Sequence, residues 1–553
     1  MKINPYPILV YFFLFSSALV YGQSIQIENF TNPLEISDLL GGDLQTDVKY
    51  TSQPGSSGNN IYIGLEELDQ NNQFVRTIDG ISLENEPAGT DMQRSVNLFV
   101  GTIQPLSTEL PAGHYYQLKA TLYTNSWSEL AYAGYWNTPS LITQNTMPYN
   151  FTDFPISKGA DISWMTEMEA QGYTWQDNDG NSTELMPLLK DYDLDAVRLR
   201  VWVDPDNSPA NGWCDIDDMV TKAQLAHAEG LDVMVCIHYS DHWADPGQQN
   251  KPQAWNSFTV SQLETAVTNH TNNILTALNA VNITPKWVQI GNETNDGMLW
   301  PTGRASTGGF ANYASFVNAG SNAVKSFNPS IKTILHLANG NDQSLYDWNI
   351  GGLINNGLNM NDIDIIGMSL YPEADNWKTL VDQTHDNMLN VQNSYNKDAM
   401  VVEIGFSNSR PDITYQFIVY MIEKTRQAQG LGVFYWEPIA YSPFTSYGKG
   451  AWDDDGSPSV AMDAFLNSST LSNEEFQLTE NHKIIVYPNP VSDQFFVKFQ
   501  GMTQMPLQIY DINGKIILED NAYISGSPVD ISDLASGIYF VKINGQAKKL
   551  MKK

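Results

Sequence analysis

The segment Trp287-Val288-Gln289-Ile290-Gly291-Asn292-Glu293 is the most informative part of the chain. Its mostly apolar run from Trp287 to Ile290 predicts a short buried strand, which ends at Gly291. Asn292 and Glu293 follow side by side before a polar loop. A carboxylate at the exit of a buried strand is unfavourable unless it has partners or a function. Glu293 is therefore either a surface residue that happens to follow a strand or part of a functional site.

Residues 155–466 repeat a pattern of an apolar strand followed by an amphipathic helix. One such helix is expected to start at Asp215, where acidic residues favour the positive helix end, and to stop at Gly230. A doubly wound open sheet is one possible fold, but no glycine-rich phosphate loop follows the first strand. Eight strand–helix units in roughly 310 residues instead favour an α/β fold, a (β/α)8 TIM barrel with long loops. The expected strands are Lys158–Ser163, Ala196–Val203, Asp232–His238, Trp287–Gly291, Lys332–Leu337, Ile363–Leu370, Met400–Glu403 and Gly432–Trp436.

Polar and aromatic side chains stand at the carboxyl ends of these strands. In a TIM barrel the active site is formed where the strands end and the βα loops begin. Two of the side chains are carboxylates, at the ends of strands four and seven. So many convergent candidates favour a site over a solvated surface. The nine residues are Asp161, Arg198, His238, Asn292, Glu293, His336, Tyr371, Glu403 and Trp436.

Glu293 and Glu403 meet the requirements of glycosidic bond cleavage. That reaction needs one carboxylic acid to protonate the leaving oxygen and one carboxylate to attack the anomeric carbon. The amide of Asn292, beside Glu293, could bind the sugar 2-hydroxyl, a contact that strengthens in the transition state. These three residues therefore suggest a glycosidase.

Three further residues have both a functional and a structural interpretation. Arg198 could keep Glu403 ionised by its opposite charge, and Tyr371 could donate a hydrogen bond to the same carboxylate. Trp436 could form an apolar floor under the sugar at the cleavage point. Ordinary burial, in an ion pair or in the barrel packing, is the alternative for each of them.

Seven motif blocks resemble glycoside hydrolase family 53, the endo-β-1,4-galactanases. They follow the order of that family between residues 158 and 438. The resemblance implies a retaining barrel glycosidase with Glu293 as acid/base and Glu403 as nucleophile. It also implies β-1,4-galactan, a side chain of pectin, as the polysaccharide substrate. The blocks are Lys158–Trp164, Val197–Pro205, His238–Gly247, Ile290–Glu293, Leu299–Arg304, Val401–Glu403 and Phe434–Pro438.

The strand-end residues and two residues of the third block are then expected to bind substrate. Two other functions stay open at this point. One is a hydrolase of the same clan that acts on mannan or xylan, and the other is a glycan-binding surface protein without activity, against which the presence of both glutamates argues. The expected substrate-binding residues are Asp161, Arg198, His238, Asp241, Trp243, Asn292, His336, Tyr371 and Trp436.

The chain departs from the family pattern at two places. Ile404-Gly405 follow the expected nucleophile where the commoner pattern has Thr. Bacterial relatives can hold calcium in a long loop after strand eight, whereas the loop from Pro438 to Trp452 is short. Asp453-Asp454-Asp455-Gly456 could attract calcium, but we interpret it as a solvated acidic turn. No metal or cofactor is expected.

The N-terminal part of the chain predicts export followed by a β-domain. Residues 1–22 combine a short basic start, an apolar run and a small-residue cleavage site, which is typical of a signal peptide. Residues 23–150 contain short alternating runs separated by clusters of Gly, Pro, Asn and Ser, which predicts a β-sandwich. Its strands are expected at Ser24–Ile27, Ile61–Leu65, Ser95–Val100, Tyr115–Leu122 and Leu130–Trp136. This module is either a rigid spacer or a carbohydrate binder.

The C-terminal part predicts a linker at 467–482 and a small β-rich domain at 483–553. Alternating runs are separated by Asn513-Gly514, a hairpin turn signal. The blocks Val486–Pro490, Asp511–Lys515 and Leu534–Val541 resemble the sorting domains of the Bacteroidetes type IX secretion system. This resemblance implies a secretion machinery as partner and removal of the tail. A further β-sandwich binding module is the alternative.

Composition excludes several classes of function. The formal net charge is −33, from 62 acidic and 29 basic residues, so nucleic acid and anionic membranes are not expected as partners. No apolar run after the signal is long enough for a membrane span. Two cysteines, Cys214 and Cys236, exclude a disulfide framework and a Cys-based zinc site. We expect a secreted, extracellular or cell-surface monomer that degrades polysaccharide.

Overall fold

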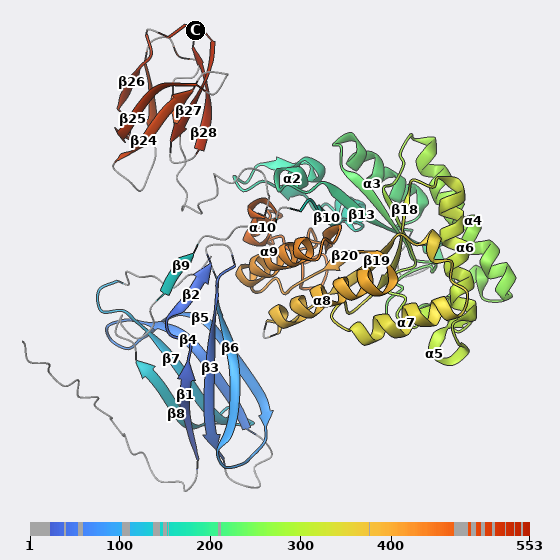
Figure 1. Ribbon diagram of the computed structural model, residues 1–553, viewed down its shortest axis with the longest axis horizontal. Helices are drawn as coiled ribbons and strands as arrows, with labels where there is room; N and C mark the ends of the chain where they lie inside the picture. The colour runs from blue at the N-terminus through green and yellow to red at the C-terminus, as the bar shows by residue number, and fades with distance from the viewer. Residues whose placement is uncertain are drawn as a thin grey trace, which may run out of the picture. The chain divides into compact units, whose positions relative to one another are not determined.

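The computed structural model forms two compact units, Met1–Ser468 and Ser469–Lys553, which are described separately (Figure 1). It describes residues 23–552 except 38–39, 53–58, 102–110, 137–143, 148–151, 153, 208–211, 375, 469–484, 488–490, 492–493, 499–503, 511–514, 526, 533, 536 and 544–545. The predicted signal peptide, most of the predicted linker and the Asn513-Gly514 turn lie outside the described residues.

Eight parallel strands in the first unit close into a barrel, as predicted. The last strand pairs with the first, and Trp436 lies beside Asp161 in this register. Every predicted barrel strand is present, and its ends differ from the prediction by at most a few residues. The strands are β10 (Ser157–Asp161), β13 (Ala196–Val201), β14 (Asp232–Ile237), β15 (Trp287–Ile290), β18 (Lys332–Leu337), β19 (Ile365–Leu370), β20 (Asp398–Ile404) and β21 (Gly432–Trp436).

Helices surround the barrel, and their ends follow local sequence rules. Asp215 caps the helix α3 because its side chain accepts a hydrogen bond from the backbone N–H of Asp218. Thr259 and Gln262 form a reciprocal capping box at the start of α4. The helices are α1 (Met165–Ala170), α2 (Leu185–Asp191), α3 (Ile216–Ala228), α4 (Val260–Ala280), α5 (Ala305–Gly308), α6 (Ala311–Phe327), α7 (Gln343–Asn355), α8 (Trp377–Tyr395), α9 (Pro411–Gln427) and α10 (Asp463–Asn467).

Short elements decorate the loops of the barrel. Two small hairpins, β11 with β12 and β16 with β17, are each antiparallel. The described loops also contain four single 3-10 turns. The bounds are β11 (Trp175–Gln176), β12 (Ser182–Thr183), β16 (Gly297–Met298), β17 (Gly303–Arg304), η1 (Pro205–Asn207), η2 (Gln253–Trp255), η3 (Met360–Asp362) and η4 (Val460–Met462).

An apolar plug fills one end of the barrel interior. Trp287 and Phe434 are buried there and meet edge to face, with ring centroids 5.9 Å apart. Gly159 is required beside them, because a Cβ at this position would lie 2.3 Å from the Phe434 ring. The polar strand ends lie at the other end of the same strands. The plug comprises Ala196, Met234, Trp287, Ile334, Ile365, Met400, Val402 and Phe434.

The N-terminal part of the first unit is built from two antiparallel sheets, in the orders β1-β3-β6 and β5-β4-β7-β8. The sequence did not predict β3 or β5. A separate parallel pair joins β2 to β9. The strands are β1 (Ser24–Phe30), β2 (Leu34–Ser37), β3 (Gly42–Thr51), β4 (Asn59–Leu68), β5 (Phe74–Glu86), β6 (Met92–Val100), β7 (Tyr115–Thr124), β8 (Glu129–Trp136) and β9 (Gln144–Met147).

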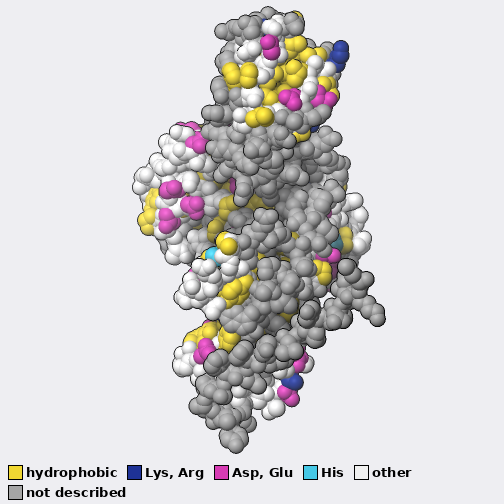
Figure 2. Space-filling view, turned by 90° about the vertical axis from the view of Figure 1, so that its left-hand side faces the viewer, with side chains coloured by type: hydrophobic (Ala, Val, Ile, Leu, Met, Phe, Trp, Pro, Cys, Tyr) yellow, Lys and Arg dark blue, Asp and Glu magenta, His cyan; other side chains and the backbone are white. Residues whose placement is uncertain are grey.

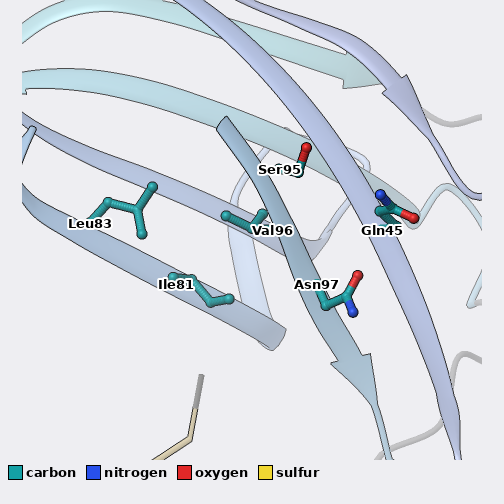
Figure 3. Close-up of a pocket in the computed structure, with 6 residues that line it drawn as sticks. All are labelled: Gln45, Ile81, Leu83, Ser95, Val96 and Asn97. Atoms are coloured by element: carbon teal, nitrogen blue, oxygen red, sulfur yellow. The ribbon is translucent and has the colours of Figure 1, made fainter. Parts of the chain in front are cut away.

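A pocket of about 410 Å³ opens beside the edge strands β5 and β6 (Figure 3). Ile81 and Leu83 of β5 supply apolar surface, and Val96 of β6 lies between two polar neighbours. Its remaining lining residues are Gln45, Ser95 and Asn97. The pocket is small and mixed in character.

The two sheets contact the barrel within the first unit. Phe99 of β6 packs edge to face on Trp377 of α8, with ring centroids 5.3 Å apart. Lys378 beside it forms an ion pair with Asp43 at 2.6 Å. The sheet domain and the barrel therefore share an apolar contact flanked by charge.

The second unit is a small pair of antiparallel sheets, in the orders β22-β23-β26 and β25-β24-β27-β28. Its own core includes Phe495, Leu507 and Val541, all buried. The sequence did not predict β26 or β28. The strands are β22 (Ile485–Tyr487), β23 (Gln494–Lys498), β24 (Gln504–Tyr510), β25 (Ile516–Ile524), β26 (Pro528–Asp530), β27 (Gly537–Ile543) and β28 (Gln546–Lys552).

Two surface properties can be stated for the described residues. None of their helices combines the length and apolarity needed to cross a bilayer. Acidic side chains are spread over the described part of the face in Figure 2, and basic ones are few. This agrees with the strongly negative net charge.

Candidate active site

Arg198 is the hub of the polar end of the barrel. It is fully buried, and its Nη1 donates to Asp161 at 2.5 Å. Its Nε donates to Gln289 at 2.7 Å, and its Nη2 donates to Asn292 Oδ1 at 2.8 Å. The same Nη2 lies 2.5 Å from Oε1 of Glu403. One guanidinium on β13 therefore links side chains at the ends of β10, β15 and β20, and it presents its charge to the Glu403 carboxylate.

Glu293 is held at a strained bend directly after β15. Gly291 has a φ of 85° and Glu293 a φ of 46°. Residues other than glycine rarely adopt this left-handed region of backbone conformation. This bend turns the carboxylate toward Ser369, whose Oγ donates to Glu293 Oε1 at 2.7 Å. Such strain persists only where the surrounding contacts enforce it.

His336 orients Ser369 and the backbone of Glu293. Its Nδ1 accepts from Gln289 Nε2 at 2.9 Å and from the backbone N–H of Glu293 at 3.3 Å. Burial and the charge of Arg198 hold the pKa of His336 well below its ordinary value, so the ring is neutral. The proton of this neutral ring is therefore assigned to Nε2, which donates to Ser369 Oγ at 2.7 Å.

The environment favours the protonated form of Glu293. Burial, and after it the charge of Glu403, raise its pKa to about 8. The hydrogen bond from Ser369 and the charge of Arg198 oppose this shift but do not cancel it. Glu293 can therefore carry a proton at neutral pH, as a general acid must.

Glu403 has neighbours that favour its ionised form. Burial raises its pKa, while Arg198 and the hydroxyl of Tyr371 oppose that shift. Tyr371 donates to Oε2 at 2.9 Å. Oε1 is next to Arg198 but accepts no hydrogen bond from the described residues. Because its charge raises the pKa of Glu293, Glu403 is the first of the two to lose its proton.

An aromatic wall borders these carboxylates. Trp436, at the end of β21, contacts Trp164 with ring centroids 5.1 Å apart and Tyr447 at 4.7 Å. Trp243 lies 5.8 Å from Trp436 and 5.9 Å from Trp164. The four rings are only partly buried, so they offer surface to a ligand. Aromatic planes of this kind stack on the C–H faces of sugars.

A buried ion pair supports the wall from behind. The guanidinium of Arg200 lies 4.4 Å from the centroid of Trp243, and its Nη1 donates to Glu437 at 3.1 Å. Both oxygens of Glu437 accept from the backbone N–H of Trp164, at 3.1 and 3.2 Å. Burial raises the pKa of Glu437 to about 8, and the charge of Asp161 adds to the shift that Arg200 opposes. The pair thus links two barrel strands to the first βα loop.

His238 and Asp241 occupy different positions. His238 is buried, and its Nδ1 accepts from the backbone N–H of Ala244 at 3.1 Å, so Nε2 carries its proton. Asp241 accepts from the backbone N–H groups of Asp204 and Gln253, at 3.1 and 2.8 Å. The structure therefore places Asp241 as a link between loops, with both carboxylate oxygens engaged there.

Asn292 keeps donor capacity for a ligand. Its Nδ2 donates to the backbone oxygen of Ala244 at 2.8 Å, and its Oδ1 accepts from Arg198. An amide nitrogen has two N–H groups, so one remains. The expected contact with a sugar hydroxyl is thus compatible with the geometry.

Gly405 accounts for one departure from the family pattern. A Cβ at this position would lie 2.4 Å from the hydroxyl of Tyr447 and 2.7 Å from the ring of Tyr371. Tyr371 is the hydrogen-bond donor to Glu403. A glycine here therefore leaves room for the two tyrosines that line this side of the cleft.

Sequence reasoning did not single out four contributors to the site: Ser369, Gln289, Arg200 and Glu437. Ser369 reaches the polar end of the barrel through the ordinary alternation of β19, in which Ile365 lies in the apolar plug, and a single Ser within an apolar run gives no signal of function. The register shift between β19 and β20 places its extra residue, Val402, in β20. Glu437 stands in the quoted block Phe434–Pro438 and Arg200 in Val197–Pro205, so both could have been examined there.

Cys214 and Cys236 are free and buried, as predicted. Cys236 receives a contact from Arg198 Nη2 at 3.0 Å. Burial raises the pKa of both thiols, which makes them poor nucleophiles. Among the described residues, no three His, Cys, Asp or Glu side chains cluster in a way that could hold a metal.

The chain is similar in sequence to fungal galactanases. The arabinogalactan endo-β-1,4-galactanase of Thermothelomyces thermophilus is 32% identical over 302 residues, which are 51% of this chain and 89% of the relative. The corresponding galactanase A of Aspergillus niger is 30% identical, over 51% of this chain and 84% of its own length.

Solved structures share the barrel. A fungal β-1,4-galactanase superposes with a TM-score of 0.51 and 29% identity, over 56% of this chain and 98% of its own. The family 53 catalytic domain of Ignisphaera aggregans superposes with a TM-score of 0.52 and 28% identity, over 58% of this chain and 98% of its own.

Two families match successive parts of the chain. Residues 485–553 match the secretion system C-terminal sorting domain, which indicates a secreted or cell-surface protein. Residues 157–482, more than half of the chain, match glycosyl hydrolase family 53. The chain therefore belongs to glycosyl hydrolase family 53.

Proposed function

We propose that the protein is a secreted retaining endo-hydrolase of β-1,4-galactan and arabinogalactan. The observation that carries the proposal is the contrast between two buried carboxylates in one cleft. Glu293 has a pKa raised to about 8, whereas Glu403 is paired with Arg198 and Tyr371. A glycosidase needs one protonated and one ionised carboxyl group beside the scissile bond.

In the first step, the Glu403 carboxylate attacks the anomeric carbon and forms a covalent glycosyl ester. Glu293 gives its proton to the leaving glycosidic oxygen, so the C–O bond breaks without forming an alkoxide. Arg198 and Tyr371 hold the nucleophile in place.

In the second step, Glu293 acts as the base. Once deprotonated, it takes a proton from a water molecule that attacks the anomeric carbon, and Glu403 leaves as a carboxylate. The ester bond breaks as the new C–O bond forms, so the product keeps the β configuration. The charge on Glu403 returns and raises the pKa of Glu293 again, which restores the acid for the next turnover.

Galactan is proposed as the substrate because similar proteins are named galactanases. Both fungal relatives are named arabinogalactan endo-β-1,4-galactanases. Asp161, Arg198, His238, Trp243, Asn292, His336, Tyr371 and Trp436 are proposed to bind or orient it. Asp241 is proposed to act indirectly, by fixing the loop that carries Trp243.

Export is proposed to follow from the two ends of the chain. The apolar leader at 1–22 would direct the first translocation. The C-terminal unit would then be recognised by a type IX secretion machinery and removed, in keeping with its match to a sorting domain.

A panel of purified polysaccharides tests the substrate. The protein is incubated with β-1,4-galactan, arabinogalactan, mannan and xylan, and new reducing ends are measured over time. We expect release from galactan and arabinogalactan only. Release from mannan or xylan alone would assign the other substrate class, and no release from any polymer would contradict a hydrolase.

A further inference from the structure

The outward face of the sheet β5-β4-β7-β8 has an unusual composition. Along β4, Ile61, Ile63 and Leu65 point into the core and are buried, so Tyr62 and Gly64 point outward. Aromatic, glycine, amide and hydroxyl residues occupy the outward positions of the central strands, together with the paired charges of Glu66 and Lys119. Such a face differs from the aliphatic centre of a protein–protein contact.

The ring of Tyr62 lies flat on this face. A Cβ at Gly64 would meet its Cε1 edge at 2.7 Å, and a Cβ at Gly80 on the adjacent strand would meet its Cε2 edge at 2.9 Å. Gly64 and Gly80 are paired across β4 and β5. Because its two edges face two neighbouring strands, the ring plane is parallel to the sheet.

Tyr132 lies on the same face two strands away. Tyr62 and Tyr132 are both register partners of Thr121, so they are about 9.6 Å apart at the backbone. The end of the Tyr132 ring covers Gly134, where a Cβ would lie 2.5 Å from its hydroxyl. Its side chain is nevertheless 44% exposed. The glycines thus leave room for both rings to pack flat against the sheet.

Two more aromatic residues extend the surface toward the β7–β8 turn. Tyr123 and Trp127 contact each other with ring centroids 5.3 Å apart, and Trp127 is 43% exposed. We call Tyr62, Tyr123, Trp127 and Tyr132 the aromatic face.

The polar groups of this surface are already paired within the protein. Tyr62 donates to Glu66 at 3.2 Å, and Glu66 forms an ion pair with Lys119 at 2.7 Å. Gln117 Nε2 donates to the hydroxyl of Tyr132. The ammonium of Lys119 also lies over the ring of Tyr62, 5.1 Å from its centroid. What remains for a ligand is the exposed π surface of Tyr132 and Trp127, with balanced charge beside it, and this suits a neutral ligand with C–H faces.

We propose that the aromatic face binds a neutral polysaccharide chain, as a second glycan site outside the barrel. Sugar rings stack on the exposed Tyr132 and on Trp127 at the rim, while Tyr62, about the length of a disaccharide from Tyr132, borders the site together with Lys119. The identification of that chain as β-1,4-galactan rests on the proposed function. The pocket of Figure 3 has no aromatic lining residue and is not part of this site.

Affinity gel electrophoresis of the full chain tests the site. Gels contain β-1,4-galactan, mannan or xylan, and the proteins are the wild type, Tyr62→Ala/Trp127→Ala/Tyr132→Ala and the control Phe74→Ala. Phe74 is also exposed, at 59%, and starts the edge strand of the same sheet. We expect the triple variant to bind about tenfold more weakly and the control to be unchanged, with kcat/KM on a short galactooligosaccharide unaltered in both.

Three outcomes would overturn the inference. They are unchanged retardation of the triple variant, an equal loss in the Phe74→Ala control, and no retardation of the wild type by any polymer. If the triple variant does not fold, Trp127→Ala and Tyr132→Ala are tested singly. A purely structural role of the rings predicts a lower melting temperature with unchanged retardation, which also contradicts the proposal.

The outcome is independent of catalysis. Retardation that depends on the aromatic face, without release of reducing ends, would support this site and contradict the proposed function. Hydrolysis of galactan with unchanged retardation of the triple variant would support the proposed function and contradict the second glycan site.

Discussion

At the scale of single residues, Glu293 and Glu403 are both buried but differ in their partners. Glu293 accepts one hydrogen bond, from Ser369. Glu403 faces a guanidinium and a phenol. This asymmetry separates the two pKa values, because opposite charge and hydrogen bonds favour the ionised form while burial favours the neutral one. A bell-shaped pH profile follows, with an acid limb from Glu403 and an alkaline limb from Glu293.

Tyr371→Phe should move the acid limb to higher pH. In the wild type, the hydrogen bond from Tyr371 lowers the pKa of Glu403. Without this bond the pKa of Glu403 rises, so Glu403 becomes protonated at a higher pH. One hydrogen bond to a charged group is worth about 1.5 kcal/mol, or about one pH unit. The profile of kcat/KM against pH measures it. Tyr441→Phe is the control, because that hydroxyl donates to Thr174 away from the carboxylates; an unmoved acid limb in Tyr371→Phe would contradict the account.

Ser369→Ala should move the alkaline limb to higher pH. The hydroxyl of Ser369 stabilises ionised Glu293 and lowers its pKa. Its removal therefore raises the pKa above about 8 and keeps the acid protonated further into the alkaline range. The same pH profile gives the answer. An alkaline limb displaced to lower pH would contradict the view that Ser369 stabilises ionised Glu293.

The sequence predicted the site residues unequally. Glu293, Asn292 and Glu403 were found because each follows an apolar run, so a strand end could be located without any coordinates. Ser369 was missed because it lies within the apolar run of β19 and not after its end, so no strand-end signal marks it. Asp241 was expected at the substrate because it stands in a motif, but both of its oxygens hold backbone N–H groups of neighbouring loops.

At the scale of elements, barrel strands were predictable because parallel strands buried on both faces are nearly continuous apolar runs. β3 was missed although its burial alternates, because Gly42 and Thr46 interrupt its apolar positions, and β5 was missed because its burial is only partial. The ion pair of Arg200 and Glu437 connects separate elements of the barrel. It joins β13 to the residue after β21 and holds the start of the loop that carries Trp164.

At pH 9, where Glu437 is ionised, Glu437→Gln should destabilise the barrel by about 3 kcal/mol, because it leaves the charge of Arg200 buried without its partner. The double variant Arg200→Met/Glu437→Gln should recover part of this loss, since no unpaired charge remains. Urea unfolding followed by tryptophan fluorescence measures both. Asp232→Asn is the control, because its pair with Lys286 is half exposed and worth less than about 1 kcal/mol. A double variant less stable than Glu437→Gln would contradict this view.

At the scale of the whole molecule, the chain consists of two units with separate cores. Removal of residues 469–553 should therefore leave kcat/KM on soluble galactan unchanged, because every residue assigned to the cleft lies in the first unit. Activity assays on soluble galactan compare kcat/KM of the truncated chain with that of the full chain. A large loss of kcat/KM in a truncated protein with an unchanged melting transition would show that the second unit contributes to the cleft.

The central claim is that Glu403 forms a covalent glycosyl ester and Glu293 hydrolyses it. Intact-mass and peptide mass spectrometry of Glu293→Ala, incubated with a dinitrophenyl β-galactobioside, tests it most directly. This leaving group departs without an acid, whereas hydrolysis of the ester still needs the missing base, so the intermediate accumulates. The account predicts a mass increase of two galactosyl units on the peptide that contains Glu403. Turnover without any adduct, or an adduct on another carboxylate, would contradict it.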